Sequence, residues 1–332
     1  MNLPGRGEWI LEICRGHWAA CTLFAAVDLG VFDVLAAGEA GLTAGEAAAA
    51  LGCAPRATAR LLDTLAGMGL LIKRGDRYRN GPAAARFLVR GGESYLGHAV
   101  HHFANLAEGW SRLGEAVRTG RAVGFEAVER EPYARRLREY ILAMRDQAAL
   151  KVEALAAALA PDGCRSMLDL GGGPGTFTIA LLRRRPALAA TIFDLAPVLE
   201  ITRELVAAAG LADRVRLQPG DFTRDELGEG IYDLALASNV VHIYDPGTNR
   251  DIVRRLYRAL RPGGRLAVHD YVLDAVPAPE AALFDLNMLV GTVCGRVYPA
   301  EEMSAWLEEA GFARVSFIPL TAGSGLITGE KS

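Results

Sequence analysis

Residues 167–175 read MLDLGGGPG, a short apolar run that ends in an acid and then breaks into consecutive glycines. This pattern predicts a buried strand that enters a tight turn. The next residues, 176–185, place apolar side chains at helical spacing and end in a basic turn, which predicts a helix. Glycines allow the sharp bend and leave the backbone open to a ligand, although a plain tight turn has the same letters. The stretch therefore predicts a strand, a glycine loop and a helix.

A second predicted strand, 189–194, also ends in an acid. Asp194 follows Gly173 by about 20 residues, the spacing at which an acid accepts hydrogen bonds from the hydroxyl groups of a ribose. The letters GGGPG lack the order of a pyrophosphate loop, and no G-K-[ST] of a P-loop follows. We therefore expect a site for a nucleoside whose linker is not a phosphate.

Three more strands are predicted over 214–218, 232–237 and 265–269, and a helix over 248–260 that ends at RPGG. After the first of these strands, Asp221 is expected to bind the amino group of an adenine and Phe222 to pack on its ring face. Ser238 and His242 follow the second strand. All four residues lie at the carboxyl ends of predicted strands, where open α/β sheets bind ligands.

Five motifs occur along the chain in a fixed order: DLGGGPG (169–175), FDL (193–195), GDF (220–222), SNVVHIYD (238–245) and LRPGG (260–264). In this order and spacing they resemble the S-adenosylmethionine-dependent small-molecule O-methyltransferases, a family of plant phenolic enzymes and bacterial enzymes of antibiotic and pigment biosynthesis. The likeness runs over nearly the whole chain. It implies a Rossmann-like, seven-stranded class I methyltransferase sheet preceded by a mainly α-helical winged-helix dimerisation domain.

The resemblance also implies S-adenosyl-L-methionine as the cofactor and S-adenosyl-L-homocysteine as its product. Together with the strand ends, it predicts a set of cofactor-binding residues: Asp169, Gly171, Gly173, Asp194, Leu195, Asp221, Phe222 and Ser238. We expect a dimerisation domain over 1–95, a helical connector that lines the acceptor site over 96–160, and the cofactor-binding domain over 161–332.

The first part of the chain, 9–35, has apolar residues most of the way round a predicted single helix. This indicates burial on more than one side, either inside its own subunit or against a second one. In the resembling family this region forms an intertwined homodimer, which favours the second possibility.

Residues 42–51 and 55–68 predict two helices and residues 70–78 a β-wing, the winged-helix pattern. Thr43 and Glu46 form a capping-box start, and Pro55 suits a first helical position. Eight Lys and Arg residues between 56 and 90 raise the possibility of DNA binding. Their scatter, and a second helix rich in Ala, Leu and Thr, argue against nucleic acid as a partner.

The composition fits a soluble two-domain protein, with 332 residues, 51% hydrophobic and 23% charged residues, and a net charge of −3. We find no apolar run of about 18 residues and no signal-peptide pattern at the start, so we expect a cytoplasmic protein without a membrane partner. Five scattered cysteines predict reduced thiols, neither disulfides nor a metal site.

Two predicted helices are expected to face the acceptor. Residues 95–120 carry His98, His101 and His102, for which a polar, half-buried helix facing the acceptor cavity is favoured over a metal pair. The helix over 133–159 carries Met144, in a stretch that in the family often passes over the cofactor.

The carboxyl-terminal part predicts helices over 281–290 and 301–310 and a closing hairpin of 315–320 and 326–328. Asp285 and Asn287 interrupt the first helix, which indicates either a substrate cavity or an exposed side. The residues predicted to bind the substrate are Met144, Asp285, Met288 and Thr292.

Methyl transfer to a hydroxyl group needs a base, and imidazole accepts a proton near neutral pH. His242 lies on the same rim as the glycine loop and matches the catalytic histidine of the resembling family, and Asp270 matches an acid that flanks it. The chain departs from the family at Ile243, where an acid is frequent, at Val297, where plant enzymes have a second flanking acid, and at Ser238, where they have a lysine.

These departures leave alternatives open. The leading prediction is methyl transfer to a hydroxyl group of a small aromatic or polyketide-like metabolite. A family member that hydroxylates or cyclises its substrate, a nitrogen or carbon acceptor, and a ligand-responsive regulator that uses the winged helix on DNA are the others.

Overall fold

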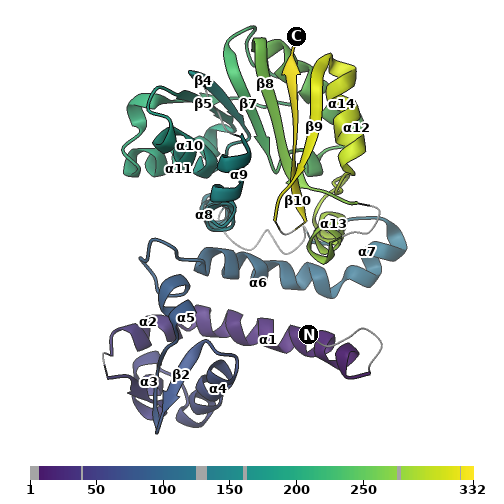
Figure 1. Cartoon of the computed structure of the whole chain (residues 1–332). Coiled ribbons are helices and arrows are strands. Elements are labelled where there is room, and N and C mark those ends of the chain that lie inside the picture. The colour runs from purple at the N-terminus through teal and green to yellow at the C-terminus, as the bar shows by residue number, and fades with distance from the viewer. Residues whose placement is uncertain (1–6, 39, 125–132, 160–162, 275–277, 322) are drawn as a thin grey trace. The chain divides into compact units, whose positions relative to one another are not determined.

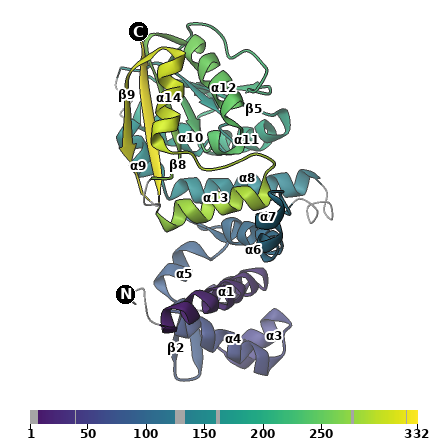
Figure 2. The ribbon, with the colours of Figure 1, turned by 90° about the vertical axis from the view of Figure 1, so that its right-hand side faces the viewer.

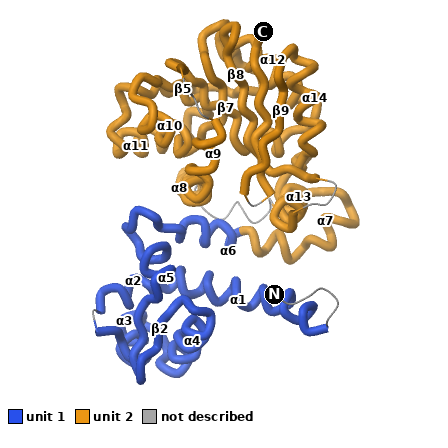
Figure 3. The backbone as a smooth tube through the Cα atoms, viewed as in Figure 1, with its two compact units in different colours: residues 1–105 blue, residues 106–332 orange. Residues whose placement is uncertain are grey.

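The computed structural model describes residues 7–38, 40–124, 133–159, 163–274, 278–321 and 323–332. The chain divides into two compact units, residues 1–105 and residues 106–332 (Figure 3). The predicted boundary between 160 and 161 lies outside the described residues. The division into three parts stays a prediction.

Unit 1 consists of short helices and a small antiparallel sheet. Its elements are α1 (Gly7–Asp28), α2 (Val31–Ala36), β1 (Leu42–Thr43), α3 (Ala44–Leu51), α4 (Pro55–Gly67), β2 (Leu71–Arg74), β3 (Arg77–Asn80), α5 (Pro82–Phe87) and the first part of α6 (Gly97–Ser111). The strand order β1-β3-β2 makes β2 and β3 the wing that follows two helices. The capping box is confirmed, because Thr43 N–H donates to Glu46 and Glu46 N–H donates to Thr43 Oγ1.

The single helix predicted over 9–35 is wrong. α1 ends at Asp28 and α2 begins at Val31, because Gly30 adopts a left-handed conformation with φ of 77°. Only the end of α1 reaches the core of unit 1, through Ala26 and Val27. Earlier apolar side chains of α1 are exposed within the chain, including Trp18 at 70%. By length and composition alone, α1 is also apolar enough to cross a membrane.

Unit 2 is built on a seven-stranded sheet, as predicted, with the order β6-β5-β4-β7-β8-β10-β9. Five strands run parallel: β4 (Ser166–Leu170), β5 (Ala189–Asp194), β6 (Val215–Pro219), β7 (Tyr232–Ser238) and β8 (Leu260–Tyr271). The last strand, β10 (Ser324–Lys331), pairs antiparallel with β8 and with β9 (Phe312–Pro319).

Helices cover both faces of this sheet (Figure 1). On one face lie α9 (Val152–Leu159), α10 (Thr176–Arg184) and α11 (Ala196–Ala208), and on the other α12 (Pro246–Ala259) and α14 (Ala300–Ala310). Alternate residues of each strand serve the two faces, so Met167 packs with α10 whereas Leu168 packs with α12. The β8 face that carries Asp270 is therefore opposite the one that carries His269.

Two more predicted helices are interrupted. The helix over 133–159 is α8 (Tyr133–Ala149) and α9, and the helix over 95–120 is α6 and α7 (Leu113–Thr119). At the breaks, Lys151 N–H donates to Ala148 and Arg112 N–H donates to Gly109, bonds to the third preceding residue that tighten the last turn. The predicted fifth strand begins earlier, because RPGG lies within β8 and not before it.

All five parallel strands end at one edge of unit 2. Two helices, α8 and α13 (Pro279–Gly291), lie at this edge in both views (Figure 1 and Figure 2). α8 packs on α11, with Ile141 buried against Val198 and Ile201. α13 packs against α7, because Val290 of α13 forms a small core with Ala116 of α7 and with Val123.

Candidate active site

The glycine loop after β4 is a close-fitting backbone turn. Gly171, Gly173 and Gly175 all have positive φ, and Gly175 is the N-cap of α10. A Cβ on Gly171 would lie 3.0 Å from Val240 and 3.3 Å from Phe222. Other side chains would therefore be strained in conformation and short of space at this position.

Asp194 at the end of β5 closes over this loop. Its carboxylate accepts hydrogen bonds from Gly173 N–H at 2.8 Å and from Leu195 N–H at 2.7 Å. It is 9% exposed, and burial raises its pKa against the lowering effect of these two donors. Each carboxylate oxygen can accept further hydrogen bonds, so the residues fit the ribose hydroxyls of a nucleoside. The structure brings Gly173, Asp194 and Leu195 together as the spacing predicts.

Asp169 lies deeper on the same face. It is buried, and its carboxylate accepts a hydrogen bond from Thr178 Oγ1 at 2.6 Å. Burial raises the pKa of Asp169 to about 7, and the nearby Asp194 charge contributes to this rise. Thr178 was not predicted from the sequence as part of the site. Thr178 lies in the first turn of α10, after the glycine loop, and this position could have indicated its contact with Asp169.

Asp221 and Phe222 follow β6. The Asp221 carboxylate accepts hydrogen bonds from Thr223 N–H and Oγ1 and from Arg224 Nε, and these contacts lower its pKa. Its described contacts thus close its own turn. Phe222 lies near Gly171 and perpendicular to the ring of Tyr244, with centroids 5.8 Å apart. Their roles toward an adenine stay predictions.

His242, just after β7, and Asp270, near the end of β8, form a buried pair. His242 lies in a short 3-10 turn, η3 (Val241–Ile243), and its Nδ1 is 2.7 Å from Asp270 Oδ1. The backbone N–H groups of His242 and Tyr271 also donate to this carboxylate, at 3.3 and 2.8 Å. No described residue forms a hydrogen bond with Nε2 of His242, which leaves that nitrogen available to a ligand.

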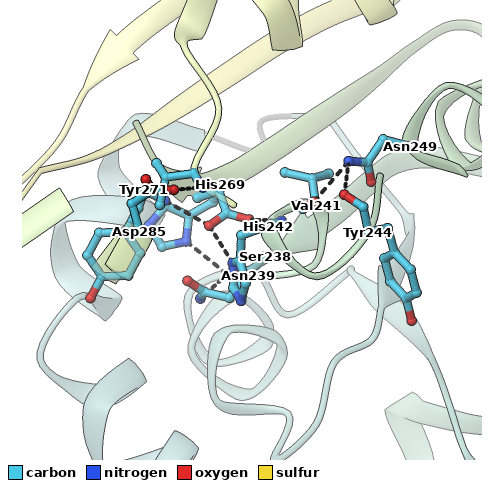
Figure 4. A network of polar contacts seen from close by, with 11 residues as sticks. Ser238, Asn239, Val241, His242, Tyr244, Asn249, His269, Tyr271 and Asp285 are labelled. Atoms are coloured by element: carbon cyan, nitrogen blue, oxygen red, sulfur yellow. Dashed lines mark hydrogen bonds and ion pairs between the residues drawn. The ribbon is translucent and has the colours of Figure 1, made fainter. Parts of the chain in front are cut away.

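Ser238 contacts a second histidine that the sequence analysis missed. Ser238 Oγ lies 2.8 Å from His269 Nδ1, and Asn239 Nδ2 donates to the same oxygen (Figure 4). Burial, followed by the positive charge of Lys151, lowers the pKa of His269 to about 4, so this imidazole is neutral. Ser238 and His269 are register partners in parallel strands, which the alignment of the two predicted strand ends could have indicated.

The predicted substrate residues divide into three cases. Asp285 accepts a hydrogen bond from Val297 N–H at 2.7 Å, and Thr292 Oγ1 bridges Met288 O and Gly295 N–H. Met288 is buried. Met144 is half-buried on α8, and no described contact joins it to the other predicted residues.

Two family models match this chain. One is the O-methyltransferase dimerisation domain, over residues 11–90, and the other is the O-methyltransferase domain, over residues 104–313. The second covers more than half of the chain.

Similar proteins agree with these models. The chain is 34% identical to the 3-hydroxy-5-methyl-1-naphthoate 3-O-methyltransferase of Streptomyces sahachiroi, over 97% of this chain and 95% of that protein. It is 33% identical to the N,N-dimethyltransferase OxyT of Streptomyces rimosus, over 91% of this chain and 90% of that one.

A solved structure agrees over the full length. The crystal structure of human N-acetylserotonin methyltransferase in complex with SAM matches with a TM-score of 0.89 and 25% identity, and each chain is covered completely. The predictions of family, enzyme class and cofactor are confirmed. This chain belongs to the S-adenosylmethionine-dependent O-methyltransferases, with a dimerisation domain and a class I methyltransferase domain.

Proposed function

We propose that His242 is the general base of this O-methyltransferase, and that the acceptor is a hydroxyl group of a small aromatic or polyketide-like metabolite. The observation that carries the proposal is the buried His242–Asp270 pair at the edge where the parallel strands end. A carboxylate at Nδ1 keeps the proton on that nitrogen and leaves the lone pair on Nε2.

The chain's residues then have distinct roles. When bound, the cofactor supplies an electrophilic methyl group on a sulfonium sulfur. Nε2 of His242 accepts the proton of the acceptor hydroxyl, and Asp270 stabilises the imidazolium that results. We assign Asp194 to the ribose, Asp221 and Phe222 to the adenine, and the loop around Gly171 to the amino-acid end of the cofactor.

The test combines binding with turnover. Titration calorimetry with S-adenosyl-L-homocysteine measures the cofactor site, and a panel of hydroxynaphthoates, naphthols and hydroxyquinones with S-adenosyl-L-methionine measures transfer. His242→Ala is expected to keep cofactor affinity within about twofold and to lower turnover by about 10²- to 10⁴-fold. Asp270→Asn is expected to lower turnover to an equivalent degree. Its matched control is Asp251→Asn, which changes an exposed acid on α12. Turnover of His242→Ala at the wild-type rate would remove the base assignment.

A nitrogen acceptor is the second candidate, because a relative of similar identity is named as an N,N-dimethyltransferase. Mass spectrometry with NMR of the product separates a methyl ether from an N-methyl group. Product analysis likewise detects the hydroxylated or cyclised compounds of a non-methylating family member.

We further propose a homodimer formed through residues 11–90, a cytoplasmic location, and no membrane or nucleic-acid partner. The match to the dimerisation domain and the exposed apolar side chains of α1 support the dimer. A mobility-shift assay with duplex DNA at low salt tests the regulator alternative. Binding whose affinity falls steeply with added salt would favour that alternative.

A further inference from the structure

The imidazole of His242 has one hydrogen bond from its side chain to the described chain, through Nδ1 to Asp270. The ring is held at Cγ by its own side chain and at Nδ1 by this hydrogen bond, so its remaining motions are changes of χ1 and χ2 that bend or break the hydrogen bond. General-base catalysis needs Nε2 within about 3 Å of the acceptor hydroxyl and the lone pair aimed at it. A packing contact on the ring would restrict these motions and keep Nε2 aimed in one direction.

Phe284 on α13 makes that contact. Its ring is perpendicular to the imidazole of His242, at 90°, with centroids 4.8 Å apart. Edge-to-face packing is a preferred geometry of aromatic pairs and opposes rotation of either ring. Phe284 also stacks on Tyr271, with ring centroids 4.1 Å apart and planes at 22°. Lys151 Nζ in turn lies 4.2 Å from the centre of the Tyr271 ring.

The backbone around Phe284 is linked to His242 independently of these rings. Arg296 N–H donates to the carbonyl oxygen of His242 at 2.9 Å, and the next residue, Val297, donates its N–H to Asp285 beside Phe284. Further along α13, Asn287 accepts a hydrogen bond from Trp110 Nε1 at 2.9 Å. Phe284 thus directly precedes a stretch of α13 that is anchored at Asp285 and Asn287.

We infer that Phe284, supported by Tyr271, is a positioning residue that restrains the His242 imidazole in its observed orientation. This inference rests on the proposed role of His242 as the base. It assigns Phe284 an effect on turnover that passes through His242 and not through binding of the cofactor.

A double-mutant cycle tests the inference, with Phe284→Ala, His242→Ala and the double variant assayed with labelled S-adenosyl-L-methionine and the most active acceptor of the panel. Phe284→Ala is expected to lower kcat by about 10- to 100-fold, with the KM for S-adenosyl-L-methionine within about twofold of wild type. In the His242→Ala background the same substitution should change kcat by less than about twofold. Phe284→Tyr keeps the aromatic contact and should restore most of the activity.

Leu283→Ala is the matched control, because Leu283 is the residue next to Phe284 on α13 and its side chain is 55% exposed. An equal loss from Phe284→Ala in both backgrounds would overturn the inference, since Phe284 would then act on the acceptor directly. An unchanged kcat in Phe284→Ala would also overturn it and would leave the role of His242 intact. If instead His242→Ala retains full activity, the proposed function itself fails.

A second test needs no methyl acceptor. Crystal structures with S-adenosyl-L-homocysteine show the orientation of the His242 imidazole in each variant. We expect the ring of His242 to change its χ1 or χ2 angle, or to occupy more than one orientation, in Phe284→Ala and to keep its orientation in Leu283→Ala. An unchanged ring plane in Phe284→Ala would contradict the inference.

Discussion

At the scale of single residues, the buried acid Asp169 couples the glycine loop to pH. Its pKa is raised from 3.8 to about 7 in the folded chain, mainly by burial. Between these values the folded state binds the proton more tightly than the unfolded state, so the contribution of this residue to stability falls as the pH rises from about 4 to about 7.

Asp169→Asn should remove this dependence, because an amide does not titrate and can still accept the hydrogen bond of Thr178. The two pKa values place the pH-dependent range between about pH 4.5 and about pH 7.5. Over this range we expect the free energy of unfolding of the variant, minus that of the wild type, to rise by a few kcal/mol. Urea unfolding of both proteins at the two pH values measures it. A difference that stays constant with pH would show that Asp169 does not carry the shifted proton.

Asp194 is the residue on which cofactor affinity should depend most. Its two backbone hydrogen bonds hold it opposite the glycine loop, and a ribose would add charge-assisted bonds. Hydrogen bonds to a charged group contribute about 1.5–3 kcal/mol, so Asp194→Ala should weaken S-adenosyl-L-homocysteine by at least about tenfold. Calorimetric titration measures this. Glu200→Gln, an exposed acid on α11, is expected to bind like the wild type, and unchanged affinity in Asp194→Ala would refute the ribose assignment.

At the scale of elements, the first parallel strands could be predicted closely from the sequence, because glycines and acids mark where each apolar run ends, whereas β8, β9 and β10 are longer or begin earlier than predicted. β5 occupies the predicted residues, and β4 and β7 differ by one residue. The breaks after Asp28, Ser111 and Ala149 were missed, because apolar spacing continues through them.

The candidate site was predictable in part, for a related reason. Asp194 and His242 lie at strand ends, and their neighbours in the sheet follow from parallel topology. The contact of Phe284 with His242 joins residues far apart in sequence, and the partners of Asp285 and Asp221 include backbone N–H groups. Neither kind of contact leaves a pattern of side-chain types that a single sequence displays.

Two glycines of unit 1 test why α1 and α2 are separate helices. Gly30 has φ of 77°, whereas Gly45 is an exposed residue in the first turn of α3 with open space around its Cα. Gly30→Ala should destabilise the protein by about 1–2 kcal/mol, and Gly45→Ala should stabilise it by about 0.5–1 kcal/mol. Denaturant unfolding compares the two. Equal effects on stability would mean that the left-handed conformation at Gly30 does not require a glycine.

At the scale of the whole molecule, the exposed apolar side chains of α1 need a partner surface. Trp9, Ile10, Ile13 and Trp18 are each between 38% and 70% exposed within the chain, and all but the first two lie in the matched dimerisation domain. Several large exposed apolar side chains on one helix favour an interaction site. A symmetric dimer would use the same face of both copies, so one substitution acts twice.

Trp18→Glu is therefore expected to weaken the dimer strongly. A buried tryptophan at an interface commonly contributes about 2 kcal/mol or more, which corresponds to a dissociation constant raised by at least about 30-fold. The matched control is Arg56→Glu, which places the same acid at an exposed position of α4. Sedimentation velocity over a range of concentrations measures both variants, and circular dichroism establishes that each is folded. A folded Trp18→Glu protein that dissociates at the same concentration as Arg56→Glu would exclude this face of α1 from the dimer and require another part of residues 11–90 to form it.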